Sequence, residues 1–402
     1  MVSTIYIAKN VYGGDGLGRL GDGRVAFVPG AFAGEQVKAE IVEERRGYVR
    51  TRLVEVVEPS PDRVGTSPAP APGMPYANVS FGCEMRLKEE QLSEMLARAR
   101  LEPGALKRIP ADLEELGYRN KAIYRFALAG GKLVAGYLKE GTRDIIDMPS
   151  DPLVRPEIDA ALPEIRSNLE ALLTKGAPAV RRDVAAKERF TVRWSPRSGV
   201  KWWLGDDVPK GSIVEITCGK TFEVPADGFY QINPTAADAL VSAVADRVVA
   251  SGCTELVDLY CGVGVFGIVA ASRSAKISSL VGVECGRTAA AAATQNAAKN
   301  SVKAAFLADR VAHAAKKIRM SPNAAVIADP PRGGFEKGVP ERLASSPAAR
   351  IFYVSCDPAT FVRDLRTLSR SYDLEEVLWI DMFPRTARFE AVAVLVRKDG
   401  AK

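Results

Sequence analysis

The 402-residue sequence contains one histidine, no closely spaced pair of cysteines and no long apolar run. The single histidine, His313, stands in a charged segment typical of a helix surface, which excludes a His-rich metal site and a serine–histidine triad. No apolar stretch approaches the ~20 residues that a membrane-spanning helix needs. The first residues also lack the pattern of a signal peptide. We therefore expect a cytoplasmic protein without a membrane partner.

The six cysteines are scattered along the chain, and none belongs to a Cys-x-x-Cys motif. Such spacing is typical of reduced thiols rather than of a disulfide framework or a metal site. The composition, with 47% hydrophobic and 26% charged residues, is that of a globular protein. The net charge of +6 suits a nucleic-acid partner but, spread over so long a chain, does not require one.

The length favours more than one domain, and the residue pattern changes along the chain. Residues 1–58 alternate short β-rich runs with glycine turns, which predicts a small OB-like barrel. A proline-rich linker is predicted over 59–75 and a mixed α/β domain over 76–227. Over 228–402, helices alternate with buried strands. This pattern predicts a parallel, doubly wound α/β sheet of the Rossmann type.

A glycine turn runs from Asp258 to Gly267, after a predicted strand and before a predicted helix. Its glycines, Gly262, Gly264 and Gly267, form a Gly-x-Gly-x-x-Gly motif, which lets the backbone approach a ligand closely. Glu284 ends the next predicted strand, where a carboxylate can accept hydrogen bonds from ribose hydroxyls. This pattern fits both a nicotinamide dinucleotide and S-adenosylmethionine.

A second loop, Asp329-Pro330-Pro331-Arg332, follows the predicted strand 325–328. Asp329 is therefore expected at the carboxyl end of that strand, where open sheets bind ligands. A dehydrogenase has no evident need for a rigid acidic loop at this position. A nucleobase methyltransferase must hold a flat ring against its methyl donor, so the loop favours S-adenosylmethionine.

Cys356, in Ser355-Cys356-Asp357-Pro358, and Glu390, at the start of the last predicted strand, are the candidates for covalent chemistry. Uracil C5 is a poor nucleophile, and addition of a thiolate at C6 makes it enolate-like. Glu390 could then remove the C5 proton. Gln231 offers an amide that could pair with a base edge or the cofactor. Taken alone, the cysteine could be core packing and the glutamate a polar residue that opens a strand.

Together these segments resemble the S-adenosylmethionine-dependent RNA uracil-5-methyltransferases, which make 5-methyluridine in transfer RNA or large-subunit ribosomal RNA. Four segments resemble successive motifs of that family and stand in the same order as in the family: Asp258–Phe266, Asp329–Arg332, Ser355–Pro358 and Asp381–Glu390. Phe229–Pro234 resembles the family's glutamine segment. Residues 1–58 resemble the TRAM domain, an RNA-binding barrel that some members carry.

The resemblance implies that Cys356 is the nucleophile and Glu390 the proton acceptor. It also implies that four residues contact S-adenosylmethionine: Gln231, Tyr260, Glu284 and Asp329. The implied partner is ribosomal or transfer RNA, presented as an unpaired or flipped nucleotide. Cytosine is the less expected target, since RNA cytosine-5-methyltransferases typically place a cysteine in the Asp-Pro loop as well.

Several positions depart from the family pattern. Val265 stands where the family often has asparagine, and Arg388 replaces a histidine common two residues before the base. Many members with the barrel bind an iron–sulfur cluster through four cysteines. Here only Cys83 remains near that pattern, and Asp151 stands where the last cysteine would fall. One cysteine cannot hold a cluster, so we expect no iron–sulfur cluster and no metal.

Two other functions are weighed against RNA methylation. A Rossmann-type NAD-dependent oxidoreductase would account for the glycine turn. An RNA-binding protein with a degenerate methyltransferase domain would account for the departures at Val265 and Arg388. A monomer is the working expectation for the oligomeric state.

Overall fold

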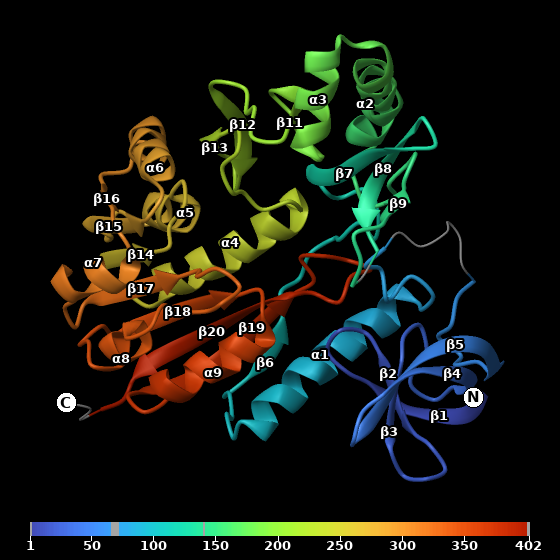
Figure 1. Ribbon diagram of the computed structural model, residues 1–402. Coiled ribbons are helices and arrows are strands. Elements are labelled where there is room, and N and C mark those ends of the chain that lie inside the picture. Colours follow the sequence, from blue (N-terminus) through green and yellow to red (C-terminus); the bar gives the residue numbers. More distant parts are fainter. Residues whose placement is uncertain (1, 66–71, 140, 400–402) are drawn as a thin grey trace. The chain divides into compact units, whose positions relative to one another are not determined.

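The computed structural model describes residues 2–65, 72–139 and 141–399 (Figure 1). The chain forms two compact units. One contains Met1–Arg100 together with Phe383–Phe389, and the other contains Leu101–Met382 together with Glu390–Lys402. The first unit thus takes in a short segment from near the end of the sequence.

The first unit contains a closed five-stranded barrel with the strand order β1-β2-β3-β5-β4. Its strands are β1 (Val2–Asn10), β2 (Gly16–Arg19), β3 (Val25–Val28), β4 (Gln36–Glu44) and β5 (Tyr48–Glu58). Alternate residues point inward, and Ile5, Ile7, Val28 and Val37 lie in the barrel core. The barrel confirms the fold predicted for this segment.

The sequence pattern does not predict β2, because Gly16-Leu17-Gly18-Arg19 has the composition of a turn. In the barrel these glycines allow close backbone approach. A Cβ at Gly18 would come within 2.4 Å of the Tyr6 carbonyl oxygen, and one at Gly16 within 2.7 Å of the Ala31 carbonyl oxygen. Glycine in this strand is therefore needed for packing.

Helix α1 (Phe81–Arg98) completes the first unit and holds the late segment of the chain. On its buried face Glu84 and Lys88 form an ion pair at 2.7 Å, and the Glu84 carboxylate accepts a hydrogen bond from the Arg385 N–H at 2.7 Å. The Arg385 guanidinium donates to the Val79 carbonyl at 2.7 Å. The residues that lead into the last strand are therefore anchored on an early helix.

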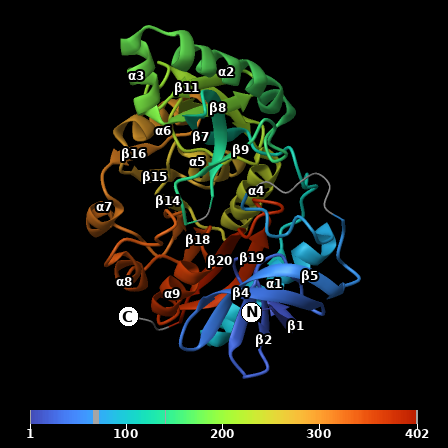
Figure 2. The ribbon, with the colours of Figure 1, turned by 45° about the vertical axis from the view of Figure 1, so that its right-hand side comes forward.

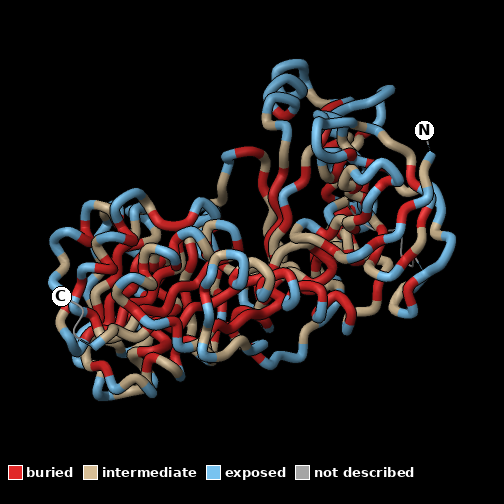
Figure 3. Tube along the Cα trace, turned by 90° about the horizontal axis from the view of Figure 1, so that it is seen from below, coloured by how far each residue is buried: buried red, intermediate tan, exposed pale blue. Residues whose placement is uncertain are grey.

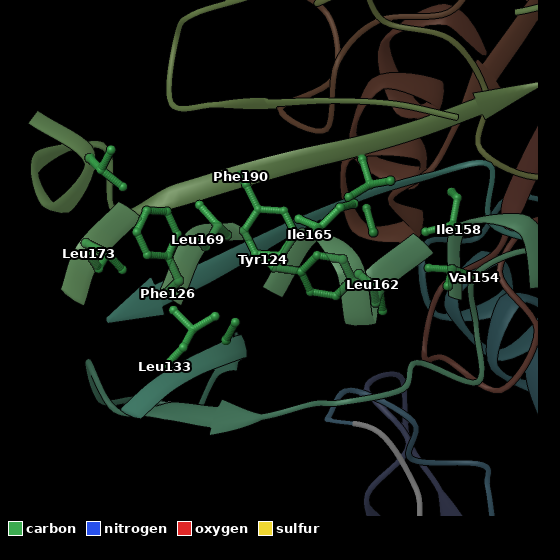
Figure 4. Packing of buried hydrophobic residues seen from close by; sticks show 14 residues of the cluster. Tyr124, Phe126, Leu133, Val154, Ile158, Leu162, Ile165, Leu169, Leu173 and Phe190 are labelled. Carbon is green, nitrogen blue, oxygen red and sulfur yellow. The ribbon is translucent and has the colours of Figure 1, made fainter. Parts of the chain in front are cut away.

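The second unit contains a five-stranded antiparallel sheet with the order β11-β10-β7-β8-β9. Its strands are β7 (Lys121–Ala129), β8 (Lys132–Leu138), β9 (Ile145–Asp147), β10 (Arg189–Ser195) and β11 (Gly199–Leu204). Helices α2 (Pro156–Lys175) and α3 (Pro178–Lys187) cover it (Figure 2). Tyr124, Phe126 and Phe190 of the sheet pack against Leu162 and Leu169 of α2 (Figure 4). A separate hairpin follows, made of β12 (Ser212–Thr217) and β13 (Lys220–Pro225).

An eight-stranded sheet with the order β16-β15-β14-β17-β18-β20-β19-β6 forms the rest of this unit. Five neighbouring strands are parallel: β14 (Glu255–Leu259), β15 (Ser279–Glu284), β16 (Ala305–Ala308), β17 (Ala324–Ala328) and β18 (Arg350–Ser355). β20 (Glu390–Arg397) lies antiparallel between β18 and β19 (Tyr372–Ile380), and β6 (Leu106–Arg108) pairs parallel with β19. Buried residues concentrate along the inner strands (Figure 3).

Helices cover both faces of the large sheet (Figure 1). On one side lie α4 (Pro234–Ala250), α5 (Val265–Arg273) and α6 (Arg287–Lys299), and on the other α8 (Val339–Ala344) and α9 (Pro358–Leu368). Helix α7 (Val311–Lys317) packs against α8. This confirms the doubly wound α/β fold. The sheet is not parallel throughout, however, because the chain returns through β19 and β20 as an antiparallel pair.

The proposed domain boundaries at residues 58, 75 and 227 stay a prediction. Residues 66–71 of the predicted linker lie outside the described part of the chain. Among the described helices, none has the length and apolar character required to cross a membrane.

Candidate active site

Four predicted site residues lie where four adjacent strands end. Tyr260 follows β14, Glu284 ends β15, Asp329 follows β17 and Cys356 follows β18. These strands are parallel neighbours in the order β15-β14-β17-β18, so their carboxyl ends meet at one edge of the sheet. That edge is where open α/β sheets bind ligands.

The glycine turn between β14 and α5 leaves open space beside one glycine and is tightly packed at the other two. A Cβ at Gly264 would come within 2.8 Å of the Ile268 side chain, and one at Gly267 within 2.8 Å of the Asp258 carboxylate. Gly262 has a φ of +55°, and apart from Gly262 and its two neighbours in the chain no atom of the described residues lies within 4 Å of where its Cβ would be. The backbone at Gly262 is therefore open to a ligand.

The Glu284 carboxylate faces this turn. One oxygen accepts a hydrogen bond from the Gly262 N–H at 3.1 Å and the other from the Gly286 N–H at 2.7 Å. The oxygen bonded to Gly286 also accepts a hydrogen bond from the Cys285 thiol at 3.3 Å, so the three donors orient the carboxylate, and the oxygen bonded to Gly262 keeps the capacity for a further hydrogen bond. A carboxylate oriented in this way beside an open glycine turn suits the hydroxyls of a ribose. The residues present thus fit an adenosine-containing cofactor.

Two more carboxyl groups, Asp258 and Asp329, lie on adjacent strands at this edge. Asp258 is 1% exposed and accepts a hydrogen bond from the Gly267 N–H at 2.9 Å. Burial raises the pKa of Asp258 to about 7, and the charges of Asp329 and Glu284 add to the rise. Burial also raises the pKa of Asp329. A positively charged ligand at this edge would favour the ionised form of both groups.

The raised pKa of Asp258 predicts how stability depends on pH. The folded protein holds this proton more tightly than the unfolded chain, whose aspartate has a pKa near 3.8, so the free energy of unfolding should fall as pH rises toward about 7. An asparagine at this position cannot ionise but keeps an acceptor for the Gly267 N–H. We expect Asp258→Asn to raise the melting temperature relative to wild type more at pH 8 than at pH 5. Equal differences at both pH values in thermal unfolding would contradict this assignment.

The loop after Asp329 is fastened to α9, the helix that follows Cys356. Three hydrogen bonds join loop backbone to α9 side chains: Arg332 C=O with Thr360 (3.2 Å), Gly333 C=O with Arg363 (2.9 Å) and Phe335 N–H with Asp364 (3.0 Å). Asp364 also accepts a hydrogen bond from the Tyr353 hydroxyl at 2.9 Å. The Phe335 ring stacks on Tyr353 with centroids 4.5 Å apart. The acidic loop and the cysteine turn are therefore held on one rigid support.

Gly334 offers a test of this support. Its φ is +75°, and a Cβ would lie 2.4 Å from the Arg363 guanidinium and 2.5 Å from the Asp364 carboxylate. At Gly333 no described atom outside that residue and its two chain neighbours lies within 4 Å of the Cβ position. We expect Gly334→Ala to cost about 1–3 kcal/mol of unfolding free energy and to reduce cofactor affinity, while the matched Gly333→Ala stays within about 1 kcal/mol of wild type. Urea unfolding and calorimetric titration would measure both, and equal effects of the two substitutions would contradict the loop's role.

Cys356 lies half-buried between the end of β18 and the start of α9. The next residue, Asp357, caps α9: its carboxylate accepts hydrogen bonds from the N–H groups of Ala359 at 3.1 Å and Thr360 at 3.0 Å. The thiol thus stands just before a helix N-terminus on a turn with a fixed backbone. The partial positive charge of a helix N-terminus favours a thiolate.

Glu390 and Cys356 lie at the same end of the β18–β20 strand pair. The antiparallel ladder between β18 and β20 ends with Ser355 opposite Ala391. Cys356 directly follows this end of β18, and Glu390 is the first residue of β20. Glu390 is 3% exposed, so a buried carboxyl group and the candidate nucleophile flank the same end of the strand pair.

Tyr260 lies at the same edge with a φ of +60°. Its hydroxyl accepts a hydrogen bond from the Glu336 N–H at 3.2 Å, which links the glycine turn to the loop after Asp329. Burial raises the pKa of Tyr260 to about 12, so its phenol is neutral at physiological pH.

Gln231 does not follow one of these parallel strands but lies in the segment between β13 and α4. Its neighbour Ile232 accepts a hydrogen bond from the Asn120 N–H at 2.9 Å. Asn233, the N-cap of α4, donates from its side chain to the Met382 carbonyl at 3.2 Å. The structure fixes the backbone around Gln231, and its contact with the cofactor stays a prediction.

Two supporting residues are not singled out by the sequence: Asp364 on α9 and Asn296 on α6. The fully buried Asn296 amide bonds to the N–H and C=O of Glu223 on β13 at 2.8 and 3.1 Å, and to the Val263 carbonyl in the glycine turn at 3.1 Å. The Asn296 side chain thus joins the β12–β13 hairpin to the glycine turn. The signal that could find such residues is a polar position on the buried face of a helix.

The surroundings of Cys83 and Asp151, the two positions compared with iron–sulfur ligands, do not suit a cluster. Burial raises the pKa of the Cys83 thiol to about 11, which disfavours the thiolate that a cluster needs. Asp151 is 1% exposed and accepts hydrogen bonds from the hydroxyls of Tyr124 at 3.0 Å and Tyr137 at 2.7 Å. Over residues 2–65, 72–139 and 141–399, no group of three or more His, Cys, Asp or Glu residues is placed to hold a metal ion. The described residues do not fit an iron–sulfur cluster.

Comparisons with known proteins match both parts of this architecture. Residues 214–398 match the family described as tRNA (uracil-5-)-methyltransferase, and residues 4–54 match the TRAM domain. An uncharacterized RNA methyltransferase of Thermosynechococcus vestitus is 28% identical, with 95% of each chain covered. Another, from Streptomyces avermitilis, is also 28% identical, with 97% of each chain covered.

A solved structure shares the fold. The tRNA (uracil-54, C5)-methyltransferase of Pyrococcus abyssi, in complex with S-adenosyl-L-homocysteine, matches with a TM-score of 0.74 and 22% identity, covering 98% of this chain and 100% of its own. The fold and these matches indicate an RNA methyltransferase that carries an N-terminal TRAM domain. The family match covers residues 214–398, which contain the parallel strands and the predicted residues Cys356 and Glu390.

Proposed function

We propose that this protein transfers a methyl group from S-adenosylmethionine to C5 of a uridine in transfer or ribosomal RNA, in the cytoplasm. The observation that supports the proposal is the antiparallel pairing of β18 with β20, which brings Cys356 and the buried Glu390 to the same end of the two strands, at a sheet edge lined by acidic groups. A nucleophile beside a buried carboxyl group supplies the two functions that methylation at C5 requires.

The thiolate of Cys356 adds to C6 of the uracil, and the C5–C6 π electrons move toward O4, which makes C5 nucleophilic. Bound S-adenosylmethionine would supply the electrophilic methyl group that C5 takes up, and the electrons of the broken S–CH3 bond would stay on the sulfur of S-adenosylhomocysteine. The Glu390 carboxylate then removes the proton from C5. The electrons of that C–H bond restore the C5–C6 double bond and expel the thiolate, so the cysteine is regenerated and one proton is left on Glu390.

Four residues would hold the cofactor: Gln231, Tyr260, Glu284 and Asp329. Glu284 is oriented to accept hydrogen bonds from ribose hydroxyls beside the open backbone of Gly262. The carboxyl groups of Asp258 and Asp329 would favour the positive charge of the donor. The family match sets aside the NAD-dependent oxidoreductase. Accordingly, S-adenosylmethionine should raise the melting temperature and NAD should not.

The product of the reaction tests the proposal. Unmodified transcripts of transfer RNA and of ribosomal RNA fragments would be incubated with labelled S-adenosylmethionine and the protein, digested to nucleosides and analysed by mass spectrometry. We expect 5-methyluridine. A product labelled only on cytidine would contradict the assigned base, and binding without any methylated product would support a degenerate catalytic domain instead.

A further inference from the structure

The second unit also contains an open pocket of about 480 Å³, and none of the predicted site residues lines it. It is formed by the turn between β10 and β11, the turn between β12 and β13, and the C-terminal end of α6. Its lining holds three cationic side chains and no acidic one. The three cations are Arg197, Lys220 and Lys299.

The positive charge of this pocket is only partly compensated. Lys299 forms an ion pair with Glu223 on β13. Arg197 is exposed and Lys220 half-buried, and neither has a carboxylate partner within 4.0 Å among the described residues. The remaining groups include the hydroxyls of Thr221 and Ser301. Cations and hydroxyls together make a lining suited to phosphate oxygens.

The end of α6 would repel an anion if its carbonyl groups were open, but the carbonyl groups of Asn296, Ala297 and Ala298 accept hydrogen bonds. The Asn300 side-chain amide donates to the carbonyl groups of Asn296 and Thr221, both at 2.9 Å. The Val302 N–H donates to the Ala297 carbonyl at 2.8 Å. These bonds satisfy acceptors that a helix end otherwise leaves unpaired, so the cations dominate the local charge.

Hydrogen bonds connect the wall of the pocket to the glycine turn. Asn300, on its wall, lies one helical turn from Asn296, whose buried amide bonds to both the hairpin and the Val263 carbonyl. A phosphate held here would therefore rest on the same support as the glycine turn.

We propose that this pocket binds backbone phosphates of the RNA substrate. The inference rests on the proposed function for its ligand, and adds to it a contact surface outside the catalytic edge. Phosphate is the group common to every RNA, and the lining offers charge without a base-reading pattern. The contact is therefore expected to strengthen binding without selecting sequence.

The test uses the protein and an oligouridine of 20 nucleotides. The affinity of the protein for this RNA would be measured by fluorescence anisotropy over a range of salt concentrations, for wild type and for the double variant Arg197→Gln/Lys220→Gln. The matched control, Arg181→Gln/Arg182→Gln, removes the same charge from an exposed face of α3. Unchanged affinity for S-adenosylhomocysteine and an unchanged melting temperature would show that both variants are folded.

We expect the pocket variant to bind more weakly and the slope of log affinity against log salt to become shallower by about 1.4, two phosphates at about 0.7 each. The control should keep the wild-type slope. A wild-type slope in the pocket variant, or an equal loss in the control, would overturn the proposal. Wild-type protein that binds oligouridine but forms no 5-methyluridine on transcripts would overturn the proposed function instead, because the slope is measured on binding alone.

Discussion

Cys356→Ala should lower methyl transfer to RNA by about four orders of magnitude or more, because no other group can form the bond to C6 that activates C5. The substitution removes only the sulfur atom from a half-buried turn whose backbone is held by the Asp357 cap. Affinity for S-adenosylhomocysteine should therefore stay close to that of wild type. Single-turnover transfer of a labelled methyl group to unmodified transcripts measures the first effect, and calorimetric titration the second.

Cys253→Ala is the matched control, since Cys253 is a buried cysteine in the turn that precedes β14. It should transfer methyl groups at a rate close to wild type. Undiminished transfer by Cys356→Ala would end the thiolate mechanism, whereas equal losses in the two variants would show that the effect comes from packing.

Glu390→Gln should slow turnover by about 10²- to 10⁴-fold while allowing the first covalent bond to form. Glutamine has nearly the same shape and cannot take up the C5 proton. Methylated RNA should therefore remain attached to the protein, and a band that resists denaturation should accumulate on gels in the presence of S-adenosylmethionine. Quenched time courses would separate attachment of RNA from its release.

Glu341→Gln removes an exposed carboxylate from the first turn of α8 and serves as the comparison. It should release methylated RNA at the wild-type rate. If Glu390→Gln also turned over normally, another base would have to remove the proton.

Much of this site could be predicted from the sequence because its signals are local. In each case a hydrophobic run ends at a polar or glycine-rich segment: the glycine turn, Glu284 at the end of a strand, and the Asp329 loop. This pattern places them at one edge of a parallel sheet. The structure puts all of them at the ends of β14, β15 and β17.

The remaining features depend on pairing between distant segments. The position of Glu390 beside Cys356 follows from β20 inserting antiparallel next to β18, which no local pattern specifies. Strand β6 has three residues and becomes a strand only by pairing with β19. Likewise, Arg385 joins the first unit because the buried carboxylate of Glu84, far away in sequence, accepts its N–H. Such contacts depend on the tertiary fold rather than on propensity.

The most direct test of the central claim replaces uridine with 5-fluorouridine in a substrate transcript. After methyl transfer, C5 then carries fluorine in place of the proton that Glu390 would remove, so the bond between sulfur and C6 should persist. Digestion with trypsin should release the RNA adduct on the peptide Ile351–Arg363, whose only cysteine is Cys356. We predict an adduct on this peptide that forms only with S-adenosylmethionine. An adduct on another residue, or none from a transcript whose uridine form is methylated at C5, would contradict the account.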